Sequence, residues 1–288
     1  MKSLSLPKFT VREVVEVCIP SIRDVELSKS LAEVQPVLDE LEAEFVSQGG
    51  VGLLFGLARS EHVGGRVSSA QMEWLYTNKF VPRDSAARKY YDLLMMAPVH
   101  GRCPLCGHRL VATIDHYLPK ESYAQHAVTP ANLIPACMEC NFRKRALVAA
   151  LAEEQTLHPY FDRLPEGQWL NAEVLATRPP TVLFQASPPQ SWPEVTRHRL
   201  ARHFELFGLA QLYAAYAASE LGEIEYGLRE VFGMGGASAV REHLERECRS
   251  RVAHDANSWQ SGLYRALSAS TWFYTEGFAT LHPQRLAG

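Results

Sequence analysis

Apolar residues recur every three to four positions through the first third of the chain, which is the period of an amphipathic helix. This pattern predicts helices through residues 9–98. Pro20, Pro36 and the glycine pairs at 49–50 and 64–65 are expected to end helices or form turns, because both residue types interrupt regular helix.

The C-terminal part returns to the helical period from Trp192 onward. A stripe of leucine and aromatic residues runs through residues 198–232, and the glycines of 233–236 are expected to break that helix. Two further helices are predicted after the break. The aromatic residues of the stripe are interpreted as core.

A different pattern separates the two helical parts. Residues 99–163 hold short apolar runs, prolines and paired cysteines, and residues 168–187 read as two strands around the Pro179–Pro180 turn. The expected fold class is mainly α with a small α+β insert. The segments expected are an N-terminal helical region, a small central module, a hairpin linker and a C-terminal helical region, at 1–98, 99–163, 164–190 and 191–288.

Inside the central module, the pattern predicts a strand over 109–116, a return strand over 132–137 and a helix over 140–154. The two strands and the helix therefore follow one another in a ββα order.

Composition and charge narrow the class of protein. Hydrophobic residues make up 47% and charged residues 21% of the 288 residues, as in an average soluble globular protein. The formal net charge of −3 excludes a polycation, so any nucleic-acid site must be a local patch. No signal peptide is recognised, and no apolar run approaches the roughly 18 residues of a membrane span. A bacterial cytoplasmic location is expected.

The six cysteines suggest a metal site. Four of them form two pairs at zinc-knuckle spacing, Cys103-x-x-Cys106 and Cys137-x-x-Cys140. Four thiolates are the ligands of a closed, structural Zn²⁺ site in a reducing compartment. Two alternatives remain open at this point: buried cysteines without a metal, and a redox-active dithiol.

Polar residues with catalytic potential lie between or beside these pairs. His116 can accept a proton from water near neutral pH. The carboxylate of Asp115 and the amide of Asn141 offer the oxygen ligands that Mg²⁺ or Mn²⁺ prefers. Asn132 precedes the predicted return strand. Each of these residues also has a structural interpretation, because Asp-His pairs often bond each other and asparagines often cap turns and helices.

The central module is basic within an acidic chain. Over residues 99–146, six Lys/Arg residues stand against three Asp/Glu residues. Four of these cations are candidates for contact with DNA phosphates: Lys120, Arg143, Lys144 and Arg145.

Taken together, these motifs resemble the zinc-containing HNH endonucleases, whose active site is the ββα-metal fold. The resemblance rests on the cysteine pair 103–106, DHYLPK at 115–120, NLIPAC at 132–137 and CMECNFRK at 137–144. It covers less than a quarter of the chain. The segment HPYFD at 158–162 is similar to one that follows the module in some bacterial HNH proteins.

The resemblance implies roles for individual residues. His116 would be the general base, Asn132 would orient it or brace the loop, and Asp115 with Asn141 would hold a catalytic Mg²⁺ or Mn²⁺. The structural Zn²⁺ would sit on Cys103, Cys106, Cys137 and Cys140.

At the level of the whole protein, the resemblance implies an endonuclease of anti-phage defence or restriction that hydrolyses DNA, with an ATPase or a sensor protein as a partner. Two alternatives stay open. One is a catalytically silent, zinc-stabilised nucleic-acid-binding or scaffold subunit, and the other is the same chemistry directed at RNA.

Overall fold

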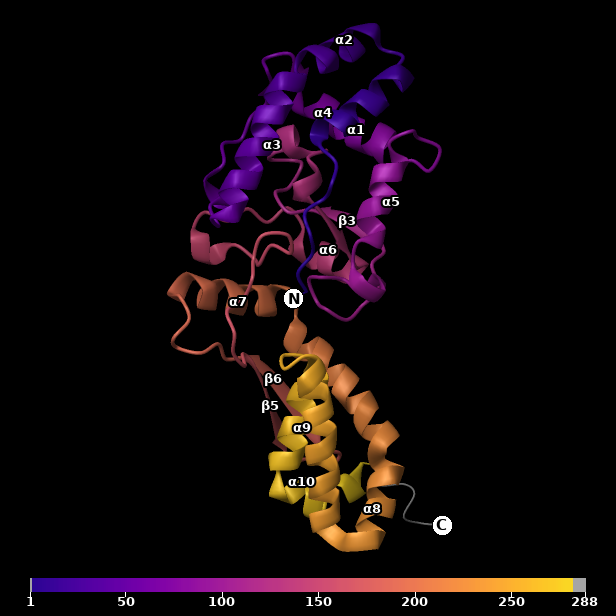
Figure 1. The fold of residues 1–288 in the computed structure, drawn as a ribbon, viewed down its shortest axis with the longest axis vertical. Helices are drawn as coiled ribbons and strands as arrows, with labels where there is room; N and C mark the ends of the chain where they lie inside the picture. The colour runs from indigo at the N-terminus through magenta and orange to yellow at the C-terminus, as the bar shows by residue number, and fades with distance from the viewer. Residues whose placement is uncertain (1, 282–288) are drawn as a thin grey trace. The chain divides into compact units, whose positions relative to one another are not determined.

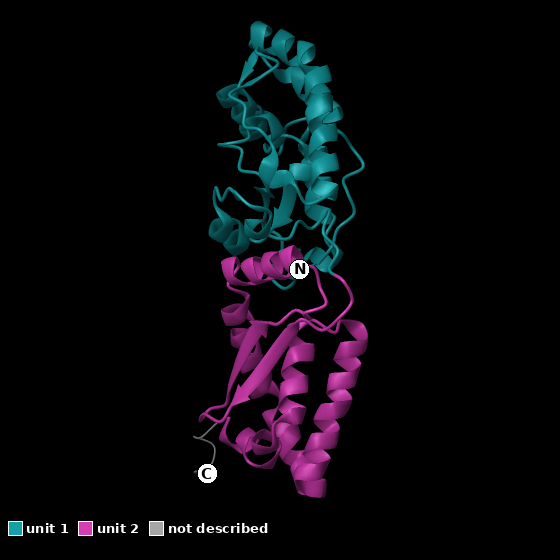
Figure 2. Ribbon diagram, turned by 90° about the vertical axis from the view of Figure 1, so that its left-hand side faces the viewer, with its two compact units in different colours: residues 1–164 teal, residues 165–288 magenta. Residues whose placement is uncertain are grey.

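The computed structural model describes residues 2–281, and the chain divides into two compact units, residues 1–164 and 165–288 (Figure 2). The segments predicted as an N-terminal helical region and a central module both belong to the first unit. The predicted hairpin and C-terminal helices belong to the second. The chain is mainly helical with small antiparallel strand pairs.

The first unit begins with a series of helices (Figure 1), and polar side chains cap the N-termini of three of them. Thr10 and Glu13 form a capping box on the first helix, and Asp24 and Ser68 cap later ones, which satisfies backbone N–H groups that have no partner within the helix. The α-helices are α1 (Val11–Cys18), α2 (Val25–Glu33), α3 (Gln35–Gly50), α4 (Ser69–Leu75) and α5 (Arg88–Met96).

Shorter elements connect these helices. Gly64 and Gly65 both have positive φ and lie in the three-residue loop of a short hairpin, β1 (His62–Val63) with β2 (Val67–Ser68). A π-helical turn (Tyr76–Phe80) extends α4. Single 3₁₀ turns occupy Ile19–Ser21, Leu54–Gly56, Val99–Gly101, Ala124–His126, Pro130–Asn132 and Ala152–Glu154.

One hydrophobic core joins these helices to a second hairpin. Buried residues of α1 to α5 pack with Ile114 of β3 (Thr113–His116) and Leu133 of β4 (Leu133–Ala136). The two strands are antiparallel, with Asp115 opposite Ile134 and His116 opposite Leu133. The helix α6 (Met138–Lys144) follows β4 and packs on β3. The helical core therefore fixes the ends of β3 and β4.

Both the first strand and the helix of this ββα segment are shorter than the sequence pattern predicts. Residues 109–111 form backbone hydrogen bonds with residues 101–103 and do not extend β3. The carbonyl of Arg109 accepts from the N–H of Cys103 at 2.7 Å. The prediction of a helix to residue 154 is wrong beyond Lys144, because Arg145 adopts a left-handed φ of 49° and ends α6. Past that point, buried Gln155 bonds the backbone of Gly52 and Phe55 and directs the chain across the end of α3.

The second unit is a long hairpin packed against helices. Strands β5 (Leu170–Leu175) and β6 (Thr181–Ala186) pair around the predicted proline turn, and α8 and α9 pack against them. Gly208, with φ of 61°, separates two helices where the pattern suggested one, and Gly235 and Gly236 kink α8 at the predicted break. The remaining elements are α7 (Glu194–Leu206), α8 (Leu209–His254), α9 (Trp259–Ala269), α10 (Thr271–Thr275) and a 3₁₀ turn (Gly277–Thr280).

Among residues 2–281, no helix combines the length and the apolar character needed to cross a membrane.

Candidate metal centre and adjoining cleft

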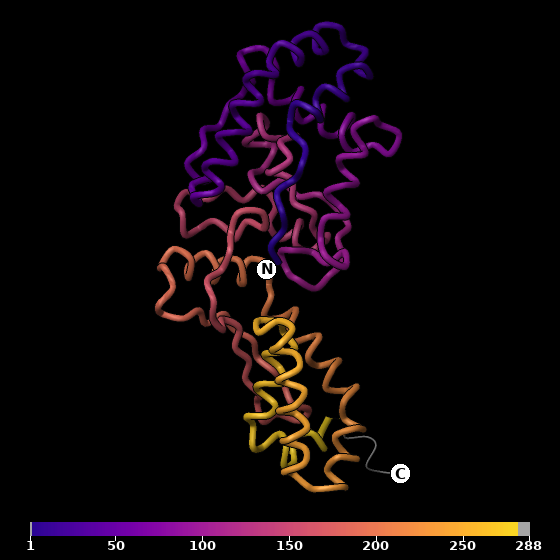
Figure 3. Tube along the Cα trace, in the orientation of Figure 1, coloured from indigo at the N-terminus to yellow at the C-terminus, as the bar shows by residue number. Residues whose placement is uncertain are grey.

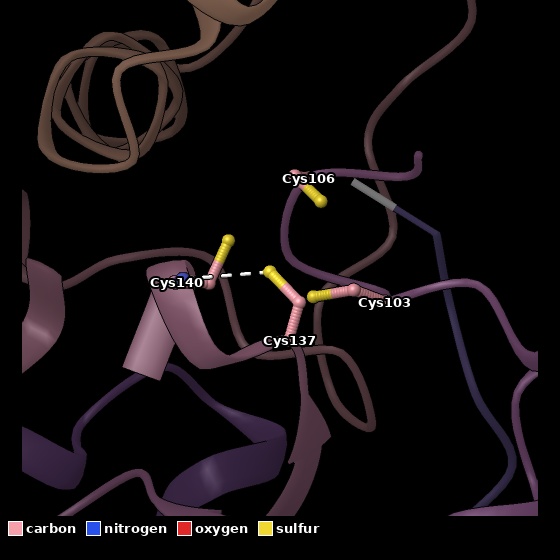
Figure 4. Close-up of side chains that lie close together, drawn as sticks. All are labelled: Cys103, Cys106, Cys137 and Cys140. Carbon is pink, nitrogen blue, oxygen red and sulfur yellow. Dashed lines mark hydrogen bonds between the residues drawn. The ribbon is translucent and has the colours of Figure 1, made fainter. Parts of the chain in front are cut away.

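The four paired cysteines form a buried cluster. Cys103 and Cys106 come from the loop before β3, and Cys137 and Cys140 come from the first turn of α6 (Figure 4). Their sulfur atoms lie within 4.8 Å of one another. Tetrahedral Zn²⁺ with bonds of about 2.3 Å holds its sulfur ligands about 3.8 Å apart, so the cluster fits such an ion with small adjustments. The cluster can therefore bind a structural metal such as zinc.

Backbone N–H groups support thiolate character at this cluster. The N–H of Arg109 lies 3.4 Å from Sγ of Cys106, and the N–H of Cys140 lies 3.4 Å from Sγ of Cys137. Because metals bind the thiolate form, these contacts favour metal binding.

The N-terminal segment braces the first cysteine pair, which no sequence pattern predicted. The N–H of Lys2 donates to the carbonyl of Pro104 at 2.8 Å, and the N–H of Leu4 donates to that of Pro159 at 2.9 Å. Arg163 adds a bond of 3.0 Å to the carbonyl of Leu4. Figure 3 shows this indigo segment running past the loops of the first unit that it contacts.

A cleft of about 490 Å³ lies at the end of β3, and its wall includes Asn141, the residue that follows Cys140 in α6. Five of the eight residues other than cysteine that were singled out from the sequence line it together, although they come from a strand, a loop and a helix. The polar and charged groups of its wall include Asp115, His116, Lys120, Glu121, Asn141 and Arg145.

The orientation of His116 is set by the loop that follows β3. Its Nε2 atom lies 2.9 Å from the carbonyl oxygen of Ala127, and a carbonyl can only accept a hydrogen bond. Nε2 therefore carries the proton of the neutral ring, and Nδ1 is the basic nitrogen. His116 is only 8% exposed, and burial lowers its pKa to about 4, so the ring is neutral at pH 7.

Asp115 is a buried carboxylate held by a lysine. The two side chains are 5% and 4% exposed, and Nζ of Lys144 lies 3.3 Å from each carboxylate oxygen of Asp115. Burial raises the pKa of Asp115 to about 6, and the charge of Lys144 opposes that rise. The Oδ2 atom of Asp115 accepts no hydrogen bond from the described residues, although it is buried.

This oxygen and the amide of Asn141 are both of a type that can bind a hard divalent cation. A buried carboxylate oxygen without a hydrogen bond is a costly feature unless something else satisfies it. Asn141 lines the same cleft and supplies an amide oxygen. Carboxylate and amide oxygens are the ligand types that Mg²⁺ and Mn²⁺ prefer.

Asn132 braces the loop and makes no hydrogen bond to His116 in the structure. It is fully buried, and its Oδ1 accepts from the N–H of Leu118 at 2.7 Å. Its Nδ2 donates to the carbonyls of Leu118 and His126 at 3.0 and 3.1 Å. These bonds fix the path of the loop that presents Ala127 to His116. Asn132 is thus placed to position the histidine indirectly.

The four basic residues expected at DNA phosphates have different surroundings. Lys144 is buried against Asp115 and also donates to the carbonyl of His116, so its predicted role as a surface phosphate contact does not fit its position. Lys120 lines the cleft but pairs with Glu73 and Glu121 at 3.1 and 2.9 Å. Arg145 lines the cleft, and Arg143 is exposed on α6, outside its lining.

Three residues of the cleft were missed from the sequence. The ring of Tyr76 meets that of His116 edge-on at 4.4 Å between centroids. Tyr91 and Glu121 also line the cleft. Glu121 follows directly after DHYLPK, and this position next to the motif could have indicated it. The two tyrosines lie in the part of the chain predicted to be helical, and nothing local to them indicates which strand they pack against.

The HPYFD segment has a packing role in the structure. His158 is buried among the rings of Phe45, Tyr117 and Phe161, and its Nδ1 accepts from the N–H of Tyr160 at 3.2 Å. It does not line the cleft.

Comparison with known proteins gives one informative match. The chain is 29% identical to protein ea31 of Escherichia phage lambda over 294 residues, which cover 95% of this chain and 99% of the relative. The similarity thus spans both units, and the relative's name states no activity. No family model matches the chain. No solved structure matches it.

Proposed function

We propose that this protein is a metal-dependent endonuclease of the HNH type that hydrolyses phosphodiester bonds in DNA. The observation that carries the proposal is that Asp115 and His116, adjacent at the end of β3, line one cleft together with Asn141, which follows Cys140 of the four-cysteine cluster. The motif resemblance supplies the reaction class, and the geometry of the cleft supports it.

The proposed base is Nδ1 of His116. Its ring is held by Ala127 and kept neutral by burial, so it can accept a proton from an attacking water at pH 7. Arg145 and Lys120 lie in the same cleft and would contact the phosphate on either side of the cleaved bond. Lys144 would keep the Asp115 carboxylate ionised and fixed in place.

A catalytic Mg²⁺ or Mn²⁺ would be held by Asp115 and Asn141. When bound, such an ion neutralises charge on the phosphate and on the leaving oxygen. The four cysteines would hold Zn²⁺ in a purely structural role, because all four positions of a tetrahedral ion are then filled by protein ligands.

The test is plasmid cleavage by the purified, zinc-loaded protein, with Mg²⁺, with Mn²⁺ and with neither ion. We expect nicked or linear product only when a divalent ion is added, and less product from RNA of similar length. Equal product without added divalent ion would contradict the proposed site.

A second candidate is a catalytically silent, zinc-stabilised subunit that binds nucleic acid or a partner. The ion pair between buried Lys144 and Asp115 favours it, since a buried carboxylate can be neutralised by a lysine without any metal. Under this alternative the protein would shift plasmid on a gel without cutting it at any divalent ion concentration.

The proposed biological setting of the reaction is the cytoplasm. A DNA substrate and thiolate ligands both suit the reducing cytoplasm. The similarity to a phage protein shows that chains of this kind occur in phages, so we propose the reaction without assigning it to host defence. A partner ATPase or sensor protein remains an expectation of the resemblance alone.

A further inference from the structure

An exposed aromatic side chain follows a cleft residue in α6. Phe142 is 67% exposed on α6, directly after Asn141, which lines the cleft. Phenylalanine is usually buried, because leaving its ring in water forgoes roughly 2 to 3 kcal/mol of hydrophobic stabilisation. The ring contributes little to the core of the first unit and is accessible to a ligand.

An arginine stacks on this ring and also reaches the cleft. The guanidinium of Arg145 lies 4.7 Å from the centroid of Phe142, and Arg145 is part of the cleft wall with Asp115 and His116. Arg145 keeps a left-handed φ of 49°, a conformation that non-glycine residues seldom adopt. The strained backbone of Arg145 thus occurs at the residue whose side chain stacks on Phe142 and lines the cleft. We call the two side chains the Phe142–Arg145 stack.

The surroundings of the stack are positive. Arg143 is exposed on the same short helix, and the one acidic residue of that helix, Glu139, is paired with Arg109 at 3.5 Å. An exposed aromatic face combined with unbalanced arginine charge suits a nucleic-acid strand, because bases stack on the ring while phosphates meet the cations.

We propose that the Phe142–Arg145 stack is a subsite for an unpaired nucleobase next to the phosphodiester that is cleaved. It follows that the preferred substrate is single-stranded DNA, or a duplex with unpaired bases at the cut site. In an intact duplex the bases are already stacked on each other, and drawing one out costs a few kcal/mol. This inference rests on the proposed function, because it takes the cleft as the cleavage site.

Equilibrium binding tests the subsite without requiring catalysis. The zinc-loaded full chain is titrated, without Mg²⁺ or Mn²⁺, into three fluorescent probes: oligothymidylate, the same backbone lacking its bases, and a duplex of equal length. We expect oligothymidylate to bind most tightly. Phe142→Ala should weaken that binding by about 5- to 150-fold, the range that base stacking provides. The same variant should hardly change binding of the abasic probe.

Matched variants separate stacking from general apolar contact. Phe142→Trp should keep the affinity for oligothymidylate, and Phe142→Leu should lose it, since leucine is apolar but has no ring face. Tyr226→Ala removes a side chain that is 70% exposed in the second unit and should change nothing.

Two outcomes overturn the inference. If Phe142→Ala binds oligothymidylate as tightly as the wild type does, or weakens the abasic probe equally, there is no stacking subsite, while metal-dependent cleavage of plasmid would still stand. If the wild type binds none of the probes, both the subsite and the DNA-directed function are contradicted.

Discussion

The Nε2 atom of His116 donates a hydrogen bond of 2.9 Å to the carbonyl oxygen of Ala127, eleven residues later in the chain. This contact fixes the tautomer of the ring and turns Nδ1 into its basic atom. It depends on the loop between β3 and β4, which Asn132 holds from within by bonds to Leu118 and His126. The orientation of the proposed base is thus a property of the folded loop, and the Asp-His motif alone does not determine it.

Removing Lys144 should destabilise the first unit by leaving a buried carboxylate without its partner. We expect Lys144→Met to lower the free energy of unfolding by about 3 to 5 kcal/mol, as breaking a buried ion pair typically does. Urea denaturation without divalent ions measures it. Lys120→Met is the matched control, because its pair with Glu73 is partly exposed and should cost about 1 kcal/mol or less.

Restoring neutrality should recover part of that loss. In the double variant Asp115→Asn/Lys144→Met, neither of the two buried positions carries a charge. Its free energy of unfolding should therefore be higher than that of Lys144→Met alone. A Lys144→Met protein that is as stable as Lys120→Met would show that the buried pair is not formed.

Replacing one cysteine of the cluster should release the metal. We expect Cys137→Ser to reduce bound zinc from about one ion per chain to almost none, and to loosen residues 103–144, because metal binding energy in such sites is folding energy. Elemental analysis and amide hydrogen exchange measure the two effects. Cys248→Ser, which changes a half-buried cysteine outside the cluster, should retain the zinc. Unchanged zinc in Cys137→Ser would show that the ligands are assigned incorrectly.

Acid should destabilise the first unit partly through His126. Burial lowers the pKa of His126 to about 4, against about 6.5 in an unfolded chain. Between about pH 6.5 and pH 4, the ring therefore binds a proton in the unfolded state but stays neutral in the folded state. The contribution of His126 to the free energy of unfolding is fully present above about pH 6.5 and is lost as the pH falls towards about 4. The total loss is about 3 kcal/mol.

Comparing His126→Gln with the wild type isolates this effect. The variant should lose less stability between pH 6.5 and pH 4, as measured by urea denaturation at each pH. His116 titrates in the same direction but is present in both proteins, so it cancels in the comparison. Identical slopes for the two proteins would mean that His126 becomes charged in the folded state.

Part of this structure could be predicted from residue patterns. The knuckle spacing of the four cysteines predicted a cluster, and the structure brings their sulfur atoms within 4.8 Å of one another. Helical periodicity located the main helices, and the glycines at 235 and 236 did mark a kink in α8. Asp115, His116 and Asn141 were selected as one site from chemistry and spacing, and they line one cleft.

Other features depend on contacts between distant parts of the chain. The alanine-rich run after Lys144 has helical propensity, yet Arg145 ends α6 with its positive φ, and Gln155 ties the far end of the run to the backbone of Gly52 and Phe55. The burial of Lys144 could not be foreseen, because a seven-residue helix gives too little periodicity to show which side faces inward. The packing of Tyr76 on His116 joins segments forty residues apart and leaves no local pattern.

The most direct test of the central claim is the rate of plasmid cleavage in Mg²⁺ by the wild type, by His116→Ala and by His62→Ala, each checked for zinc content and thermal unfolding. His62 is an exposed histidine of β1 and serves as the matched control. The account predicts that His116→Ala keeps its zinc and its fold but cleaves about 100- to 10,000-fold more slowly, while His62→Ala cleaves like the wild type. Cleavage by a folded His116→Ala protein at the wild-type rate would contradict it.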